Sequence, residues 1–399
     1  MDDCVVVGAG PAGLAASAAL TARGVAHQVL ERDRVGQTWR SQRWHSFRLN
    51  TPGWMNGMLG GQTRDTYADR AEVIERLDRL GAAAPVREGV AVTGIRPHGD
   101  GHALRTAAGD IRARTVVVAT GDQNLPRLPA AARALPDRIA QCHAAEYRSP
   151  GALPAGAVLV VGSAQSGCQI AEDLLAAGRR VFLATSPVGR LPTPYRGRDT
   201  IEWLAEVGFF AQRPSDVPDP AMLRQPMPIV APSGRELGLP ALARRGATLL
   251  GRVTGVAGER VSLDGGAAAS IAAGEAFAAR VRTMVDGAIE RLGVDTPPAD
   301  PEPDTGDPPP DPTILDLRDA GVSTVVWCTG VTGDFGWLGA DLVDSAGQPR
   351  RAGTTGPVPG LWYVGLRWLT CRGSAILHGF PTDAAAVADA VHTHLSGTT

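Results

Sequence analysis

The chain has 399 residues, of which 44% are hydrophobic, and its formal net charge at pH 7 is -2. This length allows two domains with buried cores, and the near-neutral charge supplies no strong positive field for a nucleic acid. The longest apolar stretches are strand-length and interrupted by glycine, so we expect no membrane partner, no signal peptide and a cytoplasmic location. Five scattered cysteines form no CxxC pair and no metal-ligand spacing, which predicts neither a disulfide framework nor a metal site.

A glycine-rich turn follows the first apolar run, Cys4 to Val7, and opens into an alanine-rich helical stretch. In such a strand-turn-helix unit Gly8 permits the tight turn, Gly10 lets the backbone approach a pyrophosphate, and Gly13 lets the helix pack close to the strand. The unpaired N–H groups at the helix start favour phosphate. The predicted phosphate contacts are Gly8, Gly10, Pro11, Ala12 and Gly13.

The next apolar run ends in Glu31, eighteen residues beyond Gly13. A carboxylate at this place accepts hydrogen bonds from the ribose of an adenosine. The first site is therefore predicted to hold a dinucleotide without a 2′-phosphate, and we assign it to FAD, with Glu31 and Arg32 at its rim.

Two apolar runs end in the dipeptide Thr-Gly, as is typical of segments that carry the chain between the two domains of a flavoprotein. The first run, Thr115 to Ala119, would lead out of the FAD domain, and the second, within Ser323 to Gly330, would return to it. The predicted cofactor contacts in these segments are Thr120, Gly121, Thr329 and Gly330.

The strand-turn-helix-strand order is repeated 154 positions further on, where Gly162 and Gly167 take the places of Gly8 and Gly13. A repeated unit of this kind predicts a second nucleotide site. Its predicted contacts are Gly162, Ser163, Ala164, Gln165, Ser166 and Gly167.

The second copy differs from the first at two informative positions. Ala164 replaces the middle glycine, and Thr185 stands where the first copy has its carboxylate. A methyl group at Ala164 should hold a pyrophosphate slightly farther away, and Ser186 and Arg190 could accept a 2′-phosphate that a carboxylate would repel. We therefore predict NADPH at this site, bound more loosely than FAD.

Together the two units predict an α/β fold with two Rossmann-like, dinucleotide-binding domains. The FAD domain would consist of residues 1–149 and 323–399, and an inserted NADPH domain would span residues 150–322. A nicotinamide passes hydride to a flavin only when the two rings stack, so the two domains must face each other.

Three features near the carboxyl end complete this prediction. The Pro- and Asp-rich stretch from Asp295 to Pro312 is expected to be an extended surface connection. Gly360 to Leu366 is expected to form one more buried strand, and the last helix to be capped by Thr382 or Asp383. The start of that helix is well placed to stabilise negative charge on a reduced flavin.

The ordered set of motifs resembles the flavin-containing monooxygenases, in particular the soluble bacterial and plant indole-pyruvate types. The segments that carry the resemblance are GAGPAG (8–13), VGQTWR (35–40), FRLNTP (47–52), the ATG that ends the first connection, GSAQSG (162–167) and the TG of the return strand. The group's FxGxxxHxxxY signature is half kept, because His143 and Tyr147 fit while Asp137 and Ile139 stand at the Phe and Gly positions.

The resemblance implies that NADPH reduces FAD, that O₂ adds to the flavin to give a C4a-(hydro)peroxide, and that one oxygen atom passes to a small organic substrate at nitrogen, sulfur or carbon. It implies that Trp39 lies against the flavin system, with Gln37 and Thr38 beside it. It makes Asn50 the catalytic residue, able to hydrogen-bond the flavin peroxide or the nicotinamide without ionising. The alternative for Asn50 is turn formation ahead of Thr-Pro.

His143 and Tyr147 are expected to link the domains without a direct chemical role. The segments Arg196 to Gln212 and Trp44 to Gln62 are expected to cover or line the flavin cleft. Within the first of them Arg196 and Arg198 could attract an acidic substrate or the NADPH phosphates, or they could be solvated surface residues.

Two alternatives stay open on the sequence. One is a flavin reductase of the disulfide or quinone type, which normally requires a redox cysteine pair beside the flavin. The other is an FAD-binding scaffold or sensor without turnover, which the half-kept signature would suit. The protein could also act as a monomer or as a homodimer.

Overall fold

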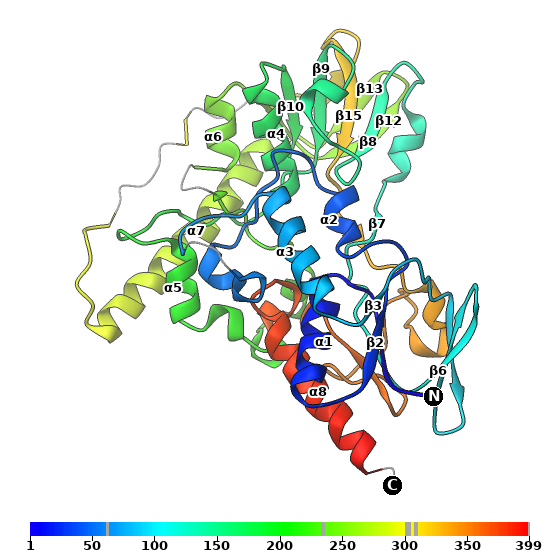
Figure 1. Ribbon diagram of the computed structural model, residues 1–399. Coiled ribbons are helices and arrows are strands. Elements are labelled where there is room, and N and C mark those ends of the chain that lie inside the picture. The colour runs from blue at the N-terminus through cyan, green and yellow to red at the C-terminus, as the bar shows by residue number, and fades with distance from the viewer. Residues whose placement is uncertain (61–63, 233–235, 300–304, 307–309, 398–399) are drawn as a thin grey trace.

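The computed structural model describes residues 1–60, 64–232, 236–299, 305–306 and 310–397. Two sheets of mainly parallel strands lie at opposite ends of the molecule, and the chain passes from one to the other and back (Figure 1). The predicted α/β architecture with two Rossmann-like units is confirmed.

The first sheet is built around β1, a valine-rich strand whose residues Cys4 to Val7 are buried. Burial on both faces is expected for a parallel strand covered by helices. The strand order is β3 (Val86–Arg87), β2 (His27–Leu30), β1 (Asp2–Val7), β6 (Gly109–Val118), β5 (Gly101–Thr106) and β4 (Gly94–His98), with β17 (Leu361–Tyr363) also paired to β6. The strand β17 confirms the buried strand expected within Gly360 to Leu366.

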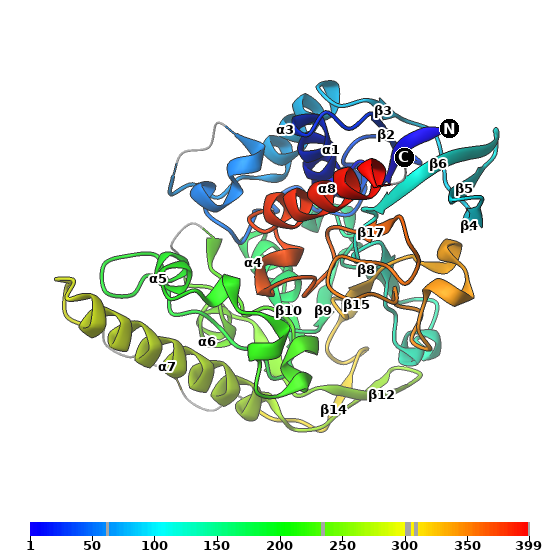
Figure 2. The ribbon, with the colours of Figure 1, turned by 90° about the horizontal axis from the view of Figure 1, so that it is seen from below.

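Three helices accompany this sheet: α1 (Pro11–Ala22), α3 (Arg70–Ala82) and α8 (Phe380–Ser396). The helix α8 lies along α1, as the turned view shows (Figure 2). It begins three residues ahead of Asp383, with Gly379 as its N-cap, so the expected capping by Thr382 or Asp383 is wrong. Pro381 lacks an N–H group and is tolerated in the first turn, which lets the helix start earlier.

The second sheet is entirely parallel. Its order is β11 (Thr248–Leu250), β10 (Val181–Ala184), β9 (Ala157–Val161), β15 (Val322–Trp327) and β8 (Ala140–His143). The helices α4 (Gln165–Ala176), α6 (Leu239–Arg244) and α7 (Ala267–Leu292) belong to this half of the chain, and α7 extends outward from it (Figure 2). An antiparallel sheet of β12 (Val253–Ala257), β13 (Arg260–Leu263) and β14 (Ile314–Asp316) follows.

The pairing of β8 and β15 bears on the predicted domain junctions at 149/150 and 322/323. Both strands belong to the second sheet, although β8 precedes the first junction and most of β15 follows the second. We therefore propose junctions near residues 139 and 328 for the inserted domain. The two connections run side by side there, since β7 (Leu125–Pro126) pairs with β16 (Val331–Thr332).

Two short helices, α2 (Gln37–Ser41) and α5 (Thr200–Glu206), flank the space between the halves. The 3-10 helices are η1 (Gly53–Leu59), η2 (Ala130–Ala134), η3 (Pro150–Ala152), η4 (Phe209–Ala211), η5 (Pro214–Asp216), η6 (Pro220–Arg224), η8 (Gly336–Leu338), η9 (Ala340–Leu342) and η10 (Arg372–Ala375). Residues 300–304 and 307–309 of the predicted proline-rich connection lie outside the described residues.

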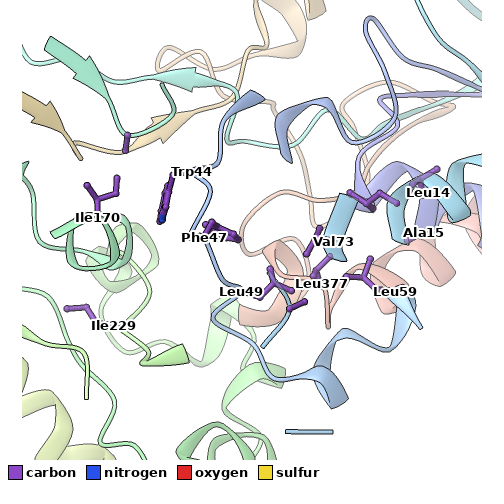
Figure 3. Close-up of a cluster of buried hydrophobic side chains, with 14 of the residues drawn as sticks. Leu14, Ala15, Trp44, Phe47, Leu49, Leu59, Val73, Ile170, Ile229 and Leu377 are labelled. Carbon is purple, nitrogen blue, oxygen red and sulfur yellow. The ribbon is translucent and has the colours of Figure 1, made fainter. Parts of the chain in front are cut away.

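One cluster of buried hydrophobic side chains joins the two halves. Trp44 and Phe47 lie between Ile170 of the second half and Val73 of the first (Figure 3). Their rings meet edge to face with centroids 5.1 Å apart. Aromatic packing of this kind stabilises the approach of the two halves beyond the burial of area alone.

Candidate functional site

The first glycine turn lies between β1 and α1. Gly8 has a φ of 105°, which favours glycine, and a Cβ at Gly13 would lie 1.9 Å from the Gly8 carbonyl oxygen. No atom lies within 4 Å of the Cβ position of Gly10, the N-cap of α1. The turn therefore packs tightly against its own helix, and the helix start lines the cleft without a side-chain cap, as a bound phosphate would require.

Glu31 lies at the rim of this turn. Its carboxylate accepts hydrogen bonds from the N–H of Ala9 (2.8 Å) and of Asp33 (3.0 Å), and it is 9% exposed. The neighbouring Arg32 is exposed and faces Asp33 (3.2 Å) and Asp334 (3.8 Å). Two backbone donors fix the Glu31 carboxylate while leaving further acceptor positions for the hydroxyl groups of a ribose.

The second glycine turn, between β9 and α4, has the same backbone. Gly162 has a φ of 104°, and a Cβ at Gly167 would lie 1.8 Å from the Gly162 carbonyl oxygen. The φ and ψ of Ala164 are -75° and -172°, against -77° and -179° for Gly10. The methyl group of Ala164 is thus accommodated without a change of backbone.

The rim of the second turn differs from that expected. Thr185 is buried, and its hydroxyl donates to the carbonyl of Leu250 at 2.8 Å. Arg190 does not line the cleft, because its Nε donates to Glu275 at 2.6 Å and its Nη2 binds the other carboxylate oxygen. The expectation that Arg190 accepts a 2′-phosphate therefore does not fit this structure, since its charge is already paired.

Two other arginines are open to the cleft at this end. Arg252 follows β11 and is exposed, and Arg280, also exposed, lies over the ring of Phe277 at 5.5 Å. Ser163 connects the turn to its rim, since its hydroxyl accepts from the N–H of Ser186 at 3.0 Å. Sequence reasoning missed both arginines because they come from strands and helices distant from the glycine motif.

Both turns open on one continuous cleft of about 1990 Å³. A pocket for one drug-sized ligand has about 300–1,000 Å³, so this cleft has room for two dinucleotides. Among the predicted site residues Gly13, Gly167 and Arg190 do not line it. Those that do are Gly8, Gly10, Pro11, Ala12, Glu31, Arg32, Gln37, Thr38, Trp39, Asn50, Thr120, Gly121, Gly162, Ser163, Ala164, Gln165, Ser166, Ser186, Thr329 and Gly330.

Trp39 and Asn50 lie in the segment that crosses the cleft between the turns. The Trp39 ring meets Phe47 edge to face at 5.8 Å, and Arg43 lies over Trp39 at 5.2 Å. Burial lowers the pKa of Arg43 to about 10, so it remains a cation at neutral pH. Its Nη2 donates to Gln123 at 3.2 Å.

The turn-forming role considered for Asn50 belongs to another residue. Asn56 donates to the carbonyls of Thr51 (2.9 Å) and Pro52 (3.0 Å) and accepts from the Thr51 hydroxyl (2.8 Å). The described part of the chain offers the Asn50 side chain no hydrogen-bond partner, and Asn50 lines the cleft. Its amide is thus available to a ligand.

His143 fastens the two connections to each other. Its Nδ1 accepts from the N–H of Ala145 at 3.1 Å, so its Nε2–H donates to the carbonyl of Gly330 at 3.0 Å. Burial lowers the pKa of His143, only partly opposed by the Gly330 carbonyl and Glu146. Tyr147 donates to Asp173 at 2.7 Å and lies away from the cleft. The His143 contact fits the linking role that the resemblance implies, whereas the Tyr147 hydrogen bond stays within the half of the molecule that contains α4.

Burial disfavours ionisation of three cysteines near the second turn. Burial raises the pKa of Cys142 to about 11 and that of Cys168 to about 12, and it raises the pKa of Cys328 further. A thiol must ionise to act as a nucleophile. The raised pKa values thus do not favour an activated thiolate at these cysteines.

The segment Arg196 to Gln212 contributes to the cleft through Phe209 and Gln212. Arg196 and Arg198 do not line it, because Arg196 binds Asp286 and Arg198, just ahead of α5, binds two carboxylates of that helix. The segment Trp44 to Gln62 contributes Trp44, Phe47, Leu49, Asn50 and Thr51, while residues 61–63 lie outside the described part. Further cleft residues that sequence reasoning missed are Arg43, Gln123, Trp368 and Arg372.

The pyridine nucleotide-disulphide oxidoreductase family matches residues 5–191 of this chain. A CzcO-like oxidoreductase of Geobacillus kaustophilus is 25% identical over 98% of this chain and 99% of its own length. The indole-3-pyruvate monooxygenase YUCCA1 of Oryza sativa is 33% identical over 44% of this chain and 46% of its own. The flavin-containing monooxygenase of Stenotrophomonas maltophilia has the same fold, with 20% identity, a TM-score of 0.66, and coverage of 98% of this chain and 99% of that one.

Two facing dinucleotide turns over one cleft, in a chain with these relatives, define an FAD-dependent oxidoreductase that also uses a nicotinamide cofactor. The residues fit FAD at the first turn, through the uncapped start of α1 after Gly10 and the fixed carboxylate of Glu31. Within this class the chain is similar in part of its sequence to an indole-3-pyruvate monooxygenase and shares its fold with a flavin-containing monooxygenase. No helix in the described residues is long and apolar enough to cross a membrane, and no group of three metal-ligating side chains occurs among them.

Proposed function

We propose that this protein is an NADPH-dependent flavin monooxygenase that transfers one oxygen atom of O₂ to a small organic substrate. The observation that carries the proposal is that both glycine turns open on one cleft, which allows a nicotinamide and a flavin to meet. When bound, the flavin would supply the hydride-accepting and oxygen-activating chemistry. The protein would bind, orient and exclude water.

The proposed FAD contacts begin at Gly8, Gly10, Glu31 and Trp39 and include the other first-turn and Thr-Gly residues that line the cleft. The proposed nicotinamide dinucleotide contacts are Gly162 to Ser166 and Ser186. Gly13 and Gly167 would act by packing rather than by contact. Asn50 would donate a hydrogen bond to oxygen held over the flavin, since an amide keeps its N–H groups at any working pH.

The preference for NADPH is proposed on the charges at the second rim. At the second rim Thr185 stands in the position equivalent to Glu31, so no carboxylate is present there. Arg252 and Arg280 are open to the cleft at this rim. A guanidinium binds phosphate oxygens through two parallel N–H groups. Arg252 and Arg280 therefore replace Arg190 in the proposed recognition of a 2′-phosphate.

The proposal is tested by mixing the FAD-loaded protein with NADPH or NADH without oxygen and following the flavin absorbance. NADPH should bleach the flavin faster than NADH, and readmitted O₂ should be consumed. Small indoles, amines and thioethers are then screened for NADPH oxidation above the basal rate. The masses of the products formed under ¹⁸O₂ are measured by mass spectrometry. Incorporation of one ¹⁸O atom is the expected result, and a flavin that NADPH cannot bleach would end the proposal.

Asn50→Ala sharpens the test of catalysis. Loss of one such donor typically lowers turnover about 100-fold. The variant should keep its rate of flavin reduction and release hydrogen peroxide in place of product. Equal product yield in the variant would remove Asn50 from the proposed chemistry.

The disulfide or quinone reductase remains the second candidate, because it shares the cleft. The raised pKa values of Cys142 and Cys328 speak against a dithiol mechanism. Turnover with a quinone or disulfide in the absence of oxygen would favour it, and absence of any reduction would favour a scaffold. A cytoplasmic location and a homodimer stay predictions for fractionation and light scattering.

A further inference from the structure

A proline-rich run of residues, Asp219 to Pro228, lies along the cleft and is largely exposed. Within the described residues its hydrogen bonds are all internal: the N–H groups of Ala221 and Met222 donate to Asp219, and that of Gln225 donates to Met222. No ion pair joins the run to another segment of that part of the chain. The members of the run that line the cleft are Met222, Arg224, Gln225, Pro226, Met227 and Pro228.

The carboxyl end of this run is fixed to the second glycine turn. The two residues that follow it, Ile229 and Val230, are buried. The Val230 N–H donates to Oε1 of Gln165 at 2.8 Å, and Nε2 of Gln165 donates to the Val230 carbonyl at 2.9 Å. Gln165 begins α4 directly after the turn, and Gly189, which lines the cleft after β10, accepts the Ile229 N–H at 2.7 Å. The described residues show no such hydrogen bond between the run and the first turn.

The chain ahead of the run is fixed to the other half of the molecule. Gln212 accepts hydrogen bonds through its side-chain oxygen from Nε and Nη2 of Arg372, at 3.2 Å and 2.6 Å. The Arg372 N–H also donates to the Gln212 carbonyl at 2.9 Å, and Arg372 lies between β17 and α8. The stretch between Gln212 and Val230 therefore has one fixed end on each half, and the run within it adjoins the second turn.

The side chains of the run suit a nucleotide as their ligand. Arg224 is exposed, lines the cleft and has no carboxylate within ion-pair distance in the described residues, so its guanidinium is available to a phosphate. Met222 and Met227 have flexible apolar side chains that adapt to the shape of a ring. Prolines restrict the backbone of the run, so less conformational entropy is lost when it becomes ordered over a ligand.

We propose that residues 219–228 form a lid that closes over the nicotinamide dinucleotide at the second turn, with Arg224 binding one of its phosphates. The fixed residues Ile229 and Val230 hold the base of the lid, while the run ahead of them is free to move. Closure of such a lid excludes water from the site and delays the release of the ligand. This inference rests on the proposed function, since it adds a moving part to the same nucleotide site.

The test is limited digestion of the FAD-loaded full chain with trypsin, with the cleaved bonds identified by mass spectrometry. Trypsin cleaves after arginine, and Arg224 and Gln225 are both exposed, so the open lid should be cleaved between them. Cleavage follows the population of the open form, and saturating NADP⁺ should slow it about 10-fold or more. Cleavage after Arg350, an exposed residue that does not line the cleft, should change less than about 2-fold.

Arg224→Gln tests the phosphate contact by titration calorimetry with NADP⁺ and NAD⁺. The Kd for NADP⁺ should rise about 2–5-fold, as expected for one exposed charged contact. An equal rise for NAD⁺ would assign Arg224 to the pyrophosphate, and a rise for NADP⁺ alone would assign it to the 2′-phosphate. The matched control is Arg213→Gln, which removes an equal charge from an exposed side chain ahead of the lid that does not line the cleft. Its Kd values should equal those of the natural protein.

Three results would each overturn the inference: equal cleavage after Arg224 with and without NADP⁺, no cleavage there in either state, or an unchanged Kd in Arg224→Gln. The outcome is separable from that of the proposed function. If NADP⁺ protects Arg224 while NADPH cannot reduce the flavin, the lid stands and the monooxygenase proposal alone fails. If NADPH reduces the flavin and O₂ is consumed without any protection of Arg224, the lid alone fails.

Discussion

The two glycine turns share one backbone and differ in what surrounds it. Gly8 and Gly162 have φ values of 105° and 104°. A Cβ atom at Gly13 would lie 1.9 Å from the carbonyl oxygen of Gly8, and one at Gly167 would lie 1.8 Å from that of Gly162. The helix-to-strand packing is therefore the same in both. The two turns differ at the rim, where Glu31 of the first corresponds to Thr185 of the second.

At the rim the two copies use the residue after their second strand, β2 or β10, in opposite ways. Glu31 turns its carboxylate onto the backbone of its own turn, where it remains in the cleft. Thr185 turns its hydroxyl away, to Leu250. A duplicated unit can thus keep its phosphate cradle and exchange its ribose recognition through one residue.

The largest expected effect comes from adding a methyl group where the helix packs against the glycine turn, at Gly13 or Gly167. Gly13→Ala should weaken FAD binding about 10–100-fold, because overpacking costs about 1–3 kcal/mol and the atom approached is backbone oxygen that cannot yield. Gly167→Ala should keep its bound flavin and instead raise the KM for NADPH by a similar factor. Flavin content and anaerobic reduction rates measure the two losses separately.

The control for these variants is Gly10→Ala. No atom lies within 4 Å of its Cβ position, and Ala164 carries a methyl group on the same backbone. This variant should fold and should bind FAD only slightly less tightly. A loss as large as that of Gly13→Ala would mean that the two turns differ in more than their rims.

Glu31→Ala ranks next. It removes the acceptor of the Ala9 N–H as well as the proposed ribose contact, and a buried donor left unpaired costs about 1–3 kcal/mol. FAD affinity should fall about 5–100-fold in apoprotein titrations. Thr185→Val, the matched change at the second rim, should leave the KM for NADPH within about 2-fold, because its hydroxyl faces Leu250. A large effect of Thr185→Val would contradict the rim comparison.

Sequence reasoning reached the local features of this molecule. Periodicity and glycine spacing were enough for both turns, for the α/β fold and for most cleft residues near the motifs, because strand, turn and helix are adjacent in the chain. The first departure is at Arg190, whose partner Glu275 lies 85 residues away. A salt bridge between distant segments leaves no trace in a local pattern.

The same reason explains the residues that were missed. Arg372 contacts Phe209 and Gln212, which approach from the other half of the chain. The junctions near residues 139 and 328 depend likewise on the pairing of β8 and β15. Contacts between distant segments decide these features, and a local sequence pattern does not contain them.

The second rim predicts a smaller effect on nucleotide choice. Arg252→Gln combined with Arg280→Gln should reduce the ratio of kcat/KM for NADPH to that for NADH about 3–10-fold, since both arginines are exposed and each such contact is weak. Arg190→Gln should leave the ratio unchanged and lower the melting temperature, because it breaks the pair with Glu275. The opposite pattern would return the 2′-phosphate to Arg190.

The smallest expected effect is on the pH dependence of stability, through His143, which hydrogen-bonds the two connections to each other. Burial lowers the pKa of His143 in the folded protein, so between that value and the ordinary pKa of about 6.5 the unfolded chain binds more protons. Stability should therefore be full above about pH 6.5 and decline as the pH falls below it. His143→Gln, which cannot take up that proton, should show a shallower decline in urea midpoints between about pH 7 and 5. Burial also lowers the pKa of His102, so part of the slope should persist in the single variant and diminish further in His102→Gln/His143→Gln. An unchanged slope in the double variant would assign the acid sensitivity to other groups.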